Sequence, residues 1–183
     1  MLVMIGCLSF VIMMLNDINQ IFNQYKIGKY AFAIGCILLG MVTIMMIIKA
    51  DFSIENIGAL QWCLLMMSIG SFVLLIYTLF FALPFKGTYI EQDQLKVYDK
   101  GVYALCRHPG VLWLFFFYWF LSLFLSSSEL RTAAVMFSLM NFIYAYLQDK
   151  LIFPRTLAGY DEYQKSVPFL IPTLTSCKQC LRK

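Results

Sequence analysis

The chain has 183 residues, of which 61% are hydrophobic and only 13% are charged. Soluble domains carry roughly a quarter charged residues, so this composition excludes a soluble domain and predicts an integral membrane protein. The lipid bilayer is therefore the expected partner. The formal net charge of +4 is explained by the excess of basic residues that membrane proteins carry in their cytoplasmic loops. No nucleic-acid partner is needed to explain it.

Five charge-poor apolar segments follow one another along the chain. About 20 apolar residues cross a hydrocarbon core of ~30 Å, which predicts an all-α protein with about five transmembrane helices. The predicted spans are Met1–Leu15, Tyr30–Ile48, Ile57–Leu83, Pro109–Ser128 and Thr132–Leu147. The first is short, but no basic residue precedes it and no small-residue cleavage site follows it. We therefore expect a retained helix rather than a signal peptide.

The predicted spans divide the chain into two regions. Residues 1–83 hold three spans, and residues 84–183 hold a polar loop, two spans and a polar C-terminal segment. Only Glu129, Leu130 and Arg131 separate the last two spans, which predicts a tight antiparallel hairpin at this C-terminal end.

A second periodic pattern follows the hairpin. Leu157, Tyr160, Tyr163 and Val167 recur near helical spacing, with polar and charged residues between them, and Pro168 follows. This pattern predicts an amphipathic helix that lies on the membrane surface or covers the hairpin.

The distribution of basic residues indicates the orientation. With five spans, all 14 basic residues except Lys49 and Arg131 lie on the same side of the membrane. The positive-inside rule makes that side the cytoplasm, and it places the C-terminus there. Short loops and small size favour a bacterial plasma membrane.

The stretch Gly101–Pro109 (GVYALCRHP) carries the strongest chemical signal, because it holds the single histidine directly before an apolar span. Pro109 suits the first turn of a helix, whose free N–H groups attract an anion. Arg107 and His108 add donors, and Tyr98 and Tyr103 offer aromatic faces that attract a cation. Such a set suits a zwitterionic sulfonium cofactor or a nucleotide phosphate.

The order of these residues resembles a known family. GVYALCRHP, a span, a short turn, a second span, Asp149 and the pattern Tyr160-x-x-Tyr163-x-x-x-Val167-Pro168 look like the isoprenylcysteine carboxyl methyltransferases. These belong to a wider group of membrane methyltransferases that includes phospholipid N-methyltransferases. The resemblance covers about Lys96–Pro172, whereas Met1–Lys86 shares only its hydrophobicity.

The resemblance implies an enzyme that transfers a methyl group from S-adenosylmethionine to a lipophilic acceptor at the cytoplasmic membrane face. It implies no metal and no catalytic residue beyond the cofactor site. Asp149 stands where the family has a glutamate that holds the cofactor, and Gln148 where a second glutamate is usual. The implied cofactor contacts are Leu95, Lys96, Val97, Tyr98, Tyr103, Arg107, His108, Pro109, Gln148, Asp149, Tyr160 and Tyr163.

Departures from the family pattern leave two alternatives open. After Arg-His-Pro the family often has x-Tyr-x-Gly, where this chain has Gly110-Val111-Leu112-Trp113. One alternative is a membrane reductase of the sterol or steroid type that uses NADPH, in which Asn-Tyr is expected after the proline. The other is a non-catalytic membrane protein with a degenerate motif.

Overall fold

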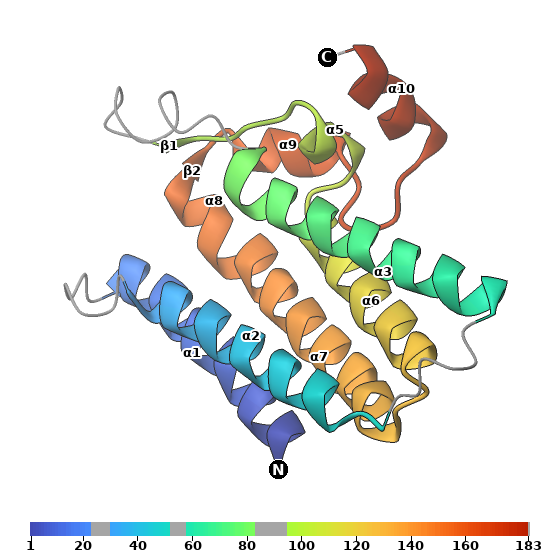
Figure 1. The fold of residues 1–183 in the computed structure, drawn as a ribbon. Coiled ribbons are helices and arrows are strands. Elements are labelled where there is room, and N and C mark those ends of the chain that lie inside the picture. Colours follow the sequence, from blue (N-terminus) through green and yellow to red (C-terminus); the bar gives the residue numbers. More distant parts are fainter. Residues whose placement is uncertain (23–29, 52–57, 83–94, 183) are drawn as a thin grey trace.

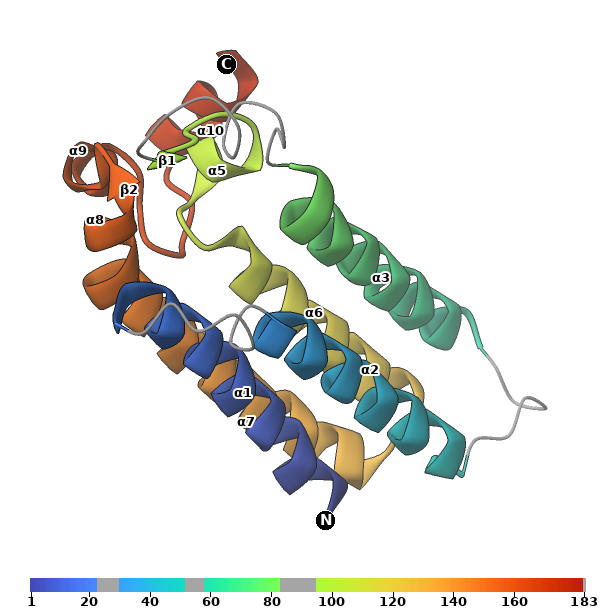
Figure 2. The ribbon, with the colours of Figure 1, turned by 90° about the vertical axis from the view of Figure 1, so that its left-hand side faces the viewer.

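The computed structural model of the chain describes residues 1–22, 30–51, 58–82 and 95–182. The described residues form five long helices that run side by side in a bundle (Figure 1). They are α1 (Leu2–Phe22), α2 (Ala31–Lys49), α3 (Ala59–Ile76), α6 (Pro109–Phe124) and α7 (Ser128–Leu147). Two of them continue as π-helical turns, α3 into η3 (Tyr77–Phe81) and α7 into η4 (Gln148–Ile152). The two chain ends lie at opposite ends of the molecule (Figure 2).

The prediction of a helical fold is confirmed, and four of the five predicted spans are supported by the length and composition of the helices. In the described part of the chain, α1, α2, α3 with η3, and α7 with its continuation are long and apolar enough to cross a membrane. Helix α6 is apolar but has only 16 residues, or about 24 Å at 1.5 Å per residue. It is thus shorter than the ~30 Å hydrocarbon core that a perpendicular span would cross.

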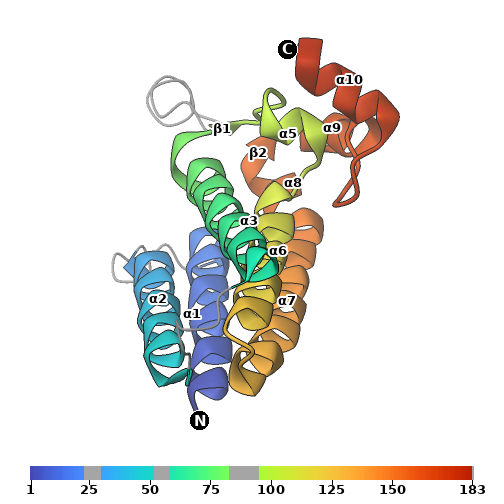
Figure 3. The same ribbon diagram turned by 45° about the vertical axis from the view of Figure 1, so that its right-hand side comes forward.

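The five helices share one core. Helix α1 packs on α2 and α7, and α6 packs on α3 and α7 (Figure 3). Phe10 of α1 lies against Phe137 of α7, which also meets Tyr118 of α6 edge-on. The Tyr118 hydroxyl shares a 2.5 Å hydrogen bond with Thr43 of α2. The N-terminal and C-terminal regions of the chain are therefore packed together through their interiors.

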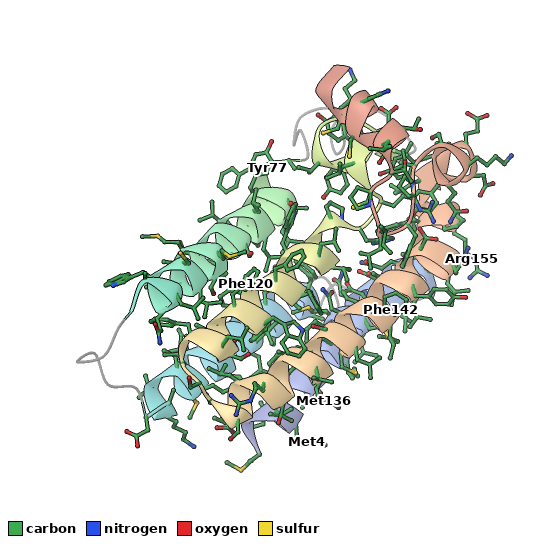
Figure 4. The ribbon with its side chains drawn as sticks, turned by 90° about the vertical axis from the view of Figure 1, so that its right-hand side faces the viewer. Met4, Tyr77, Phe120, Met136, Phe142 and Arg155 are labelled. Atoms are coloured by element: carbon green, nitrogen blue, oxygen red, sulfur yellow. The ribbon has the colours of Figure 1, made fainter. Side chains whose placement is uncertain are left out.

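The outer surface of the bundle is apolar. Met4, Tyr77 and Phe142 are 70%, 46% and 42% exposed and point away from the bundle (Figure 4). Such exposed apolar side chains are compatible with contact to hydrocarbon. A bilayer also requires that backbone N–H and C=O groups be hydrogen-bonded within the protein, and helices fulfil this requirement.

The hairpin turn lies earlier than the sequence predicts. We expected the turn at Glu129–Arg131, but α7 already begins at Ser128. The Ser127 side chain accepts a hydrogen bond from the Leu130 N–H and so caps the helix, and Glu129 in the first turn faces the positive end of the helix dipole. The connection is therefore the segment before it, where Ser126 has a positive φ of 49°.

Short elements form a cap on the end of the bundle that also carries the C-terminus (Figure 1). Strand β1 (Leu95–Lys96) pairs in parallel with β2 (Leu157–Ala158). Between and after them lie the helices α5 (Val102–Leu105), α8 (Phe153–Thr156), α9 (Tyr160–Ser166) and α10 (Leu174–Arg182). The residues of the predicted amphipathic helix form β2 and α9, and α9 is shorter than the predicted helix because Leu157 belongs to β2. Residues 84–94 of the predicted polar loop lie outside the described residues.

Candidate functional site

The Arg-His-Pro motif is fastened to the C-terminal segment through its backbone. Cys106 is extended after α5, and α6 begins at Pro109, as the sequence predicts. Between them the Arg107 N–H donates to the Pro168 carbonyl at 2.9 Å, and the His108 N–H donates to the Phe169 carbonyl at 3.2 Å. These two backbone hydrogen bonds tie the motif to the segment after α9, and both motif side chains reach Asp149 just after α7.

Asp149 is the centre of the site and is fully buried. Its Oδ1 accepts from Arg107 Nε at 2.7 Å and from the Tyr160 hydroxyl at 2.7 Å, and His108 Nε2 lies 3.3 Å away. Its Oδ2 accepts from Arg107 Nη2 at 3.2 Å and from Gln164 Nε2 at 3.1 Å. The carboxylate is therefore surrounded by protein donors, and the buried negative charge is paired and hydrogen-bonded.

Arg107 uses its remaining donors on backbone oxygens. Its Nη1 donates to the Gln164 carbonyl at 2.9 Å and to the Val167 carbonyl at 2.6 Å. Its guanidinium carbon lies 5.7 Å from the centre of the Phe169 ring, close enough for cation–π attraction. We refer to Arg107, His108, Asp149, Tyr160 and Gln164 as the Arg107–Asp149 cluster.

Aromatic rings enclose the histidine of the cluster. His108 is 7% exposed and stacks on Phe153 with ring centres 5.8 Å apart and planes 8° apart. The Phe169 ring is tilted against it, with ring centres 5.0 Å apart. These contacts fix the imidazole within the protein, so His108 acts on its neighbours rather than on solvent.

The two predicted tyrosines of the closing helix are both buried and serve different partners. Tyr160 donates to Asp149, whereas the Tyr163 hydroxyl donates to the Tyr103 carbonyl at 2.6 Å. Burial raises the pKa of both phenols, and for Tyr160 the hydrogen bond to the Asp149 carboxylate raises its pKa further. Both phenols therefore remain neutral donors. Gly159 makes the turn into α9 with φ of 81°, a value that favours glycine.

The predicted site residues that precede the Arg-His-Pro motif contact β2, α9 and η3. Val97 packs on the cluster of Tyr160, Tyr163 and Val167, and the Tyr98 and Tyr103 rings meet edge-on at 6.3 Å. The Tyr103 hydroxyl donates to the Thr78 carbonyl of η3 at 3.0 Å. Leu95 and Lys96 form β1 and so bring this stretch beside β2.

Gln148 is the predicted site residue that the structure places elsewhere. Its Nε2 donates to Asp17 Oδ2 of α1 at 2.7 Å, and it lines a separate cavity. The π-helical turn η4 holds both Gln148 and Asp149. Because successive residues of a helix point in different directions, the two side chains enter different clusters.

Sequence reasoning missed two residues that take part in these buried polar contacts. Gln164 binds both the side chain and the backbone of Asp149, and its position four residues after Tyr160 was the available signal. Asp17 is buried at the end of an apolar helix. An acidic residue in a membrane-spanning helix is itself such a signal.

The chain matches no family model, no curated protein and no solved structure.

Proposed function

We propose that this chain is an S-adenosylmethionine-dependent methyltransferase of the membrane that acts on a lipophilic acceptor. The observation that carries the proposal is the Arg107–Asp149 cluster. Residues separated from Asp149 by 42 and 11 positions in the sequence, Arg107 and Tyr160, meet on its carboxylate. They are the residues to which the resemblance assigns the cofactor site.

The residues of the candidate site differ in how accessible they are to a cofactor. Arg107, His108, Asp149 and Tyr160 are engaged with one another, and an Asp149 oxygen would reach a cofactor only by exchanging a protein donor for it. Tyr98 and Tyr103 are half-buried, and their rings can face a sulfonium cation. The fit to the cofactor therefore depends on these two tyrosines, with the Arg107–Asp149 cluster as the group that positions the loop carrying them.

Methyl transfer requires the protein mainly to position the two reactants. When bound, S-adenosylmethionine supplies an electrophilic methyl group to a nucleophile on the acceptor. The protein's part is to align the two reactants and to exclude water. The apolar exterior of the helices offers a lipophilic acceptor a route from the bilayer. The basic residues and the positive-inside rule support a cytoplasmic location for this end of the bundle.

A second candidate function is favoured by the saturation of Asp149. The described side chains leave the carboxylate with a full set of protein donors, as expected of a joint between the cap and the bundle. In a non-catalytic membrane protein the same cluster would fasten α9 and the loop before α6 to the end of α7.

Calorimetry with purified protein in a neutral detergent separates these functions. We expect micromolar binding of S-adenosylhomocysteine, weakened at least tenfold by Tyr98→Leu because one aromatic face is lost. Tyr30→Leu is the matched control, since Tyr30 is 69% exposed and lies at the start of α2. Binding of NADPH instead would indicate a reductase. If folded protein binds neither compound, the non-catalytic function is supported.

A further inference from the structure

The candidate cofactor site is connected to α1, which lies outside the region of the resemblance. The end of α1 lies beside η4, the turn that joins α7 to α8 (Figure 2). Asp17 of α1 is 7% exposed. Its Oδ2 accepts from the Tyr144 hydroxyl at 2.8 Å and from Gln148 Nε2 at 2.7 Å. Asp17 therefore binds a side chain from the last turn of α7 and the side chain of the first residue of η4.

Gln148 is joined to the Arg107–Asp149 cluster through the backbone in two ways. Asp149 is the next residue, so the direction of its carboxylate depends on the backbone that the Gln148 side chain holds. The Gln148 carbonyl also accepts from the Phe153 N–H and so closes the π-helical turn. Phe153 in turn stacks on His108 with ring centres 5.8 Å apart. A displacement of Gln148 would therefore move both Asp149 and a ring that covers His108.

The turn η4 is held from two directions. From the cap, Gln164 Nε2 donates to the Asp149 carbonyl at 2.8 Å, and Arg107 and Tyr160 donate to the Asp149 side chain. From the bundle, Asp17 holds the residue before it. Single π-helical turns of this kind are rare in proteins and are frequent at functional sites.

We propose that Asp17 is a positioning residue of the candidate cofactor site and that it acts through Gln148 on Asp149 and His108. The inference rests on the proposed function, because it gives α1 a part in the binding of S-adenosylmethionine. Asp17 itself touches neither the cofactor nor the acceptor. It fixes η4 so that the Asp149 carboxylate meets its donors, and the Arg107–Asp149 cluster then positions the loop before α6.

The positioning role requires an acceptor oxygen at Asp17 rather than its charge. The described donors to Asp17 are one hydroxyl and two amides, the second amide being Asn16 Nδ2 at 3.0 Å from Oδ1. All three donors are neutral. An amide oxygen has two acceptor positions, so Asp17→Asn keeps an oxygen that can accept from both Tyr144 and Gln148. Asp17→Leu keeps none.

The first test uses the single histidine of the chain. A magnetic resonance spectrum of the full chain with isotope-labelled histidine, in a neutral detergent and without cofactor, shows His108 alone. Gln148→Leu removes a donor to Asp17 and should shift the His108 signals, because the contacts of the ring with Asp149 and Phe153 change. A variant that only loses stability would leave these signals of the folded protein in place.

Asn141→Leu is the matched control for Gln148→Leu. Both residues are half-buried, and Asn141 lies two turns earlier on the same face of the helix. We expect it to leave the His108 signals in place. A direct contact between Gln148 and the cofactor would not move these signals either, because the spectrum is recorded without cofactor.

The second test is calorimetric titration of S-adenosylhomocysteine into the same proteins. We expect Gln148→Leu and Asp17→Leu to weaken binding at least tenfold, and Asp17→Asn to restore most of the binding that Asp17→Leu loses. Asn141→Leu should bind as the wild type does.

Unmoved His108 signals in folded Gln148→Leu would overturn the proposal, as would equal binding by Asp17→Leu and the wild type. If Asp17→Leu does not fold, the His108 signals of Gln148→Leu decide the question. Failure of the proposed function has a different result, since the wild type would then not bind S-adenosylhomocysteine. The His108 signals would still show whether Asp17 and Gln148 position Asp149.

Discussion

Gln148 and Asp149 are consecutive residues, but their side chains belong to two different polar clusters. Gln148 binds Asp17 at 2.7 Å, and Asp149 binds Arg107 at 2.7 Å. The turn that holds them has π-helical hydrogen bonding, a feature frequent at functional sites. One helical turn thus connects α1, the end of α7 and the cap.

The pair of Arg107 and Asp149 is expected to dominate the stability of the cap. Arg107→Gln would remove the nearest charged partner of the buried Asp149 carboxylate and a donor to the Gln164 and Val167 carbonyls. We expect a loss of about 3–5 kcal/mol in the free energy of unfolding. Denaturant titration in detergent measures it, with the exposed Arg155→Gln as control. Equal stability of the two variants would show that the pair is not a stabilising contact.

Tyr160 is expected to support the same carboxylate as a neutral donor. Tyr160→Phe removes one hydrogen bond to Asp149, which should cost about 1–2 kcal/mol. The pKa of Tyr160 is raised above its usual 10.0 by burial and by Asp149. The stabilisation by the Tyr160–Asp149 hydrogen bond is therefore fully present below pH 10. It is lost only as the pH rises through the raised pKa of Tyr160 in the folded protein.

Unfolding of the wild type and of Tyr160→Phe at several pH values checks this prediction. The stability difference between the two proteins should be constant from about pH 6 to pH 9. A difference that shrinks within that range would contradict it.

Gly35 is expected to be required for the packing of α1 on α2. A Cβ atom at Gly35 would lie 2.8 Å from the Ser9 carbonyl oxygen and 2.5 Å from the Met13 side chain. Gly35→Ala should therefore destabilise the bundle by about 1–3 kcal/mol. At Gly40, on the same helix, an added Cβ would meet nothing within 4 Å. Gly40→Ala should be neutral or slightly stabilising, because alanine favours helix.

The thermal midpoints of the two alanine variants give the answer. If both variants unfold at the same temperature, the close approach of α1 and α2 does not contribute to stability in solution.

Cys106 is expected to resist alkylation in the folded protein. The side chain is fully buried, and burial raises its thiol pKa from 9.0 to about 12. Because only the thiolate reacts, the reactive fraction at pH 8 falls about 1000-fold. Mass-spectrometric mapping after iodoacetamide treatment should show no label on Cys106 until the protein is unfolded in dodecyl sulfate. Rapid labelling of the folded protein would place Cys106 at an accessible surface.

Local patterns in the sequence are enough to predict the class of fold and the starts of several elements. Apolar length predicted the helices, and the proline of the Arg-His-Pro motif predicted the start of α6 at Pro109. The turn before α7 was misplaced, because a short segment containing Glu129 and Arg131 resembles a loop when the Ser127 cap is not considered. Periodicity found Tyr160 and Tyr163 on one face, but it could not show that they bind different partners.

The helical and apolar character of this protein follows from its amino-acid sequence, because both properties depend on residues within a few positions of one another. Which polar groups meet depends instead on contacts between residues far apart in the chain. Arg107 reaches Asp149 across 42 residues, and Tyr144 and Gln148 reach Asp17 across 127 and 131 residues. Such contacts depend on how α1, α6 and α7 pack together. In an apolar surrounding each buried polar group must find a partner, and the packing determines which partner that is.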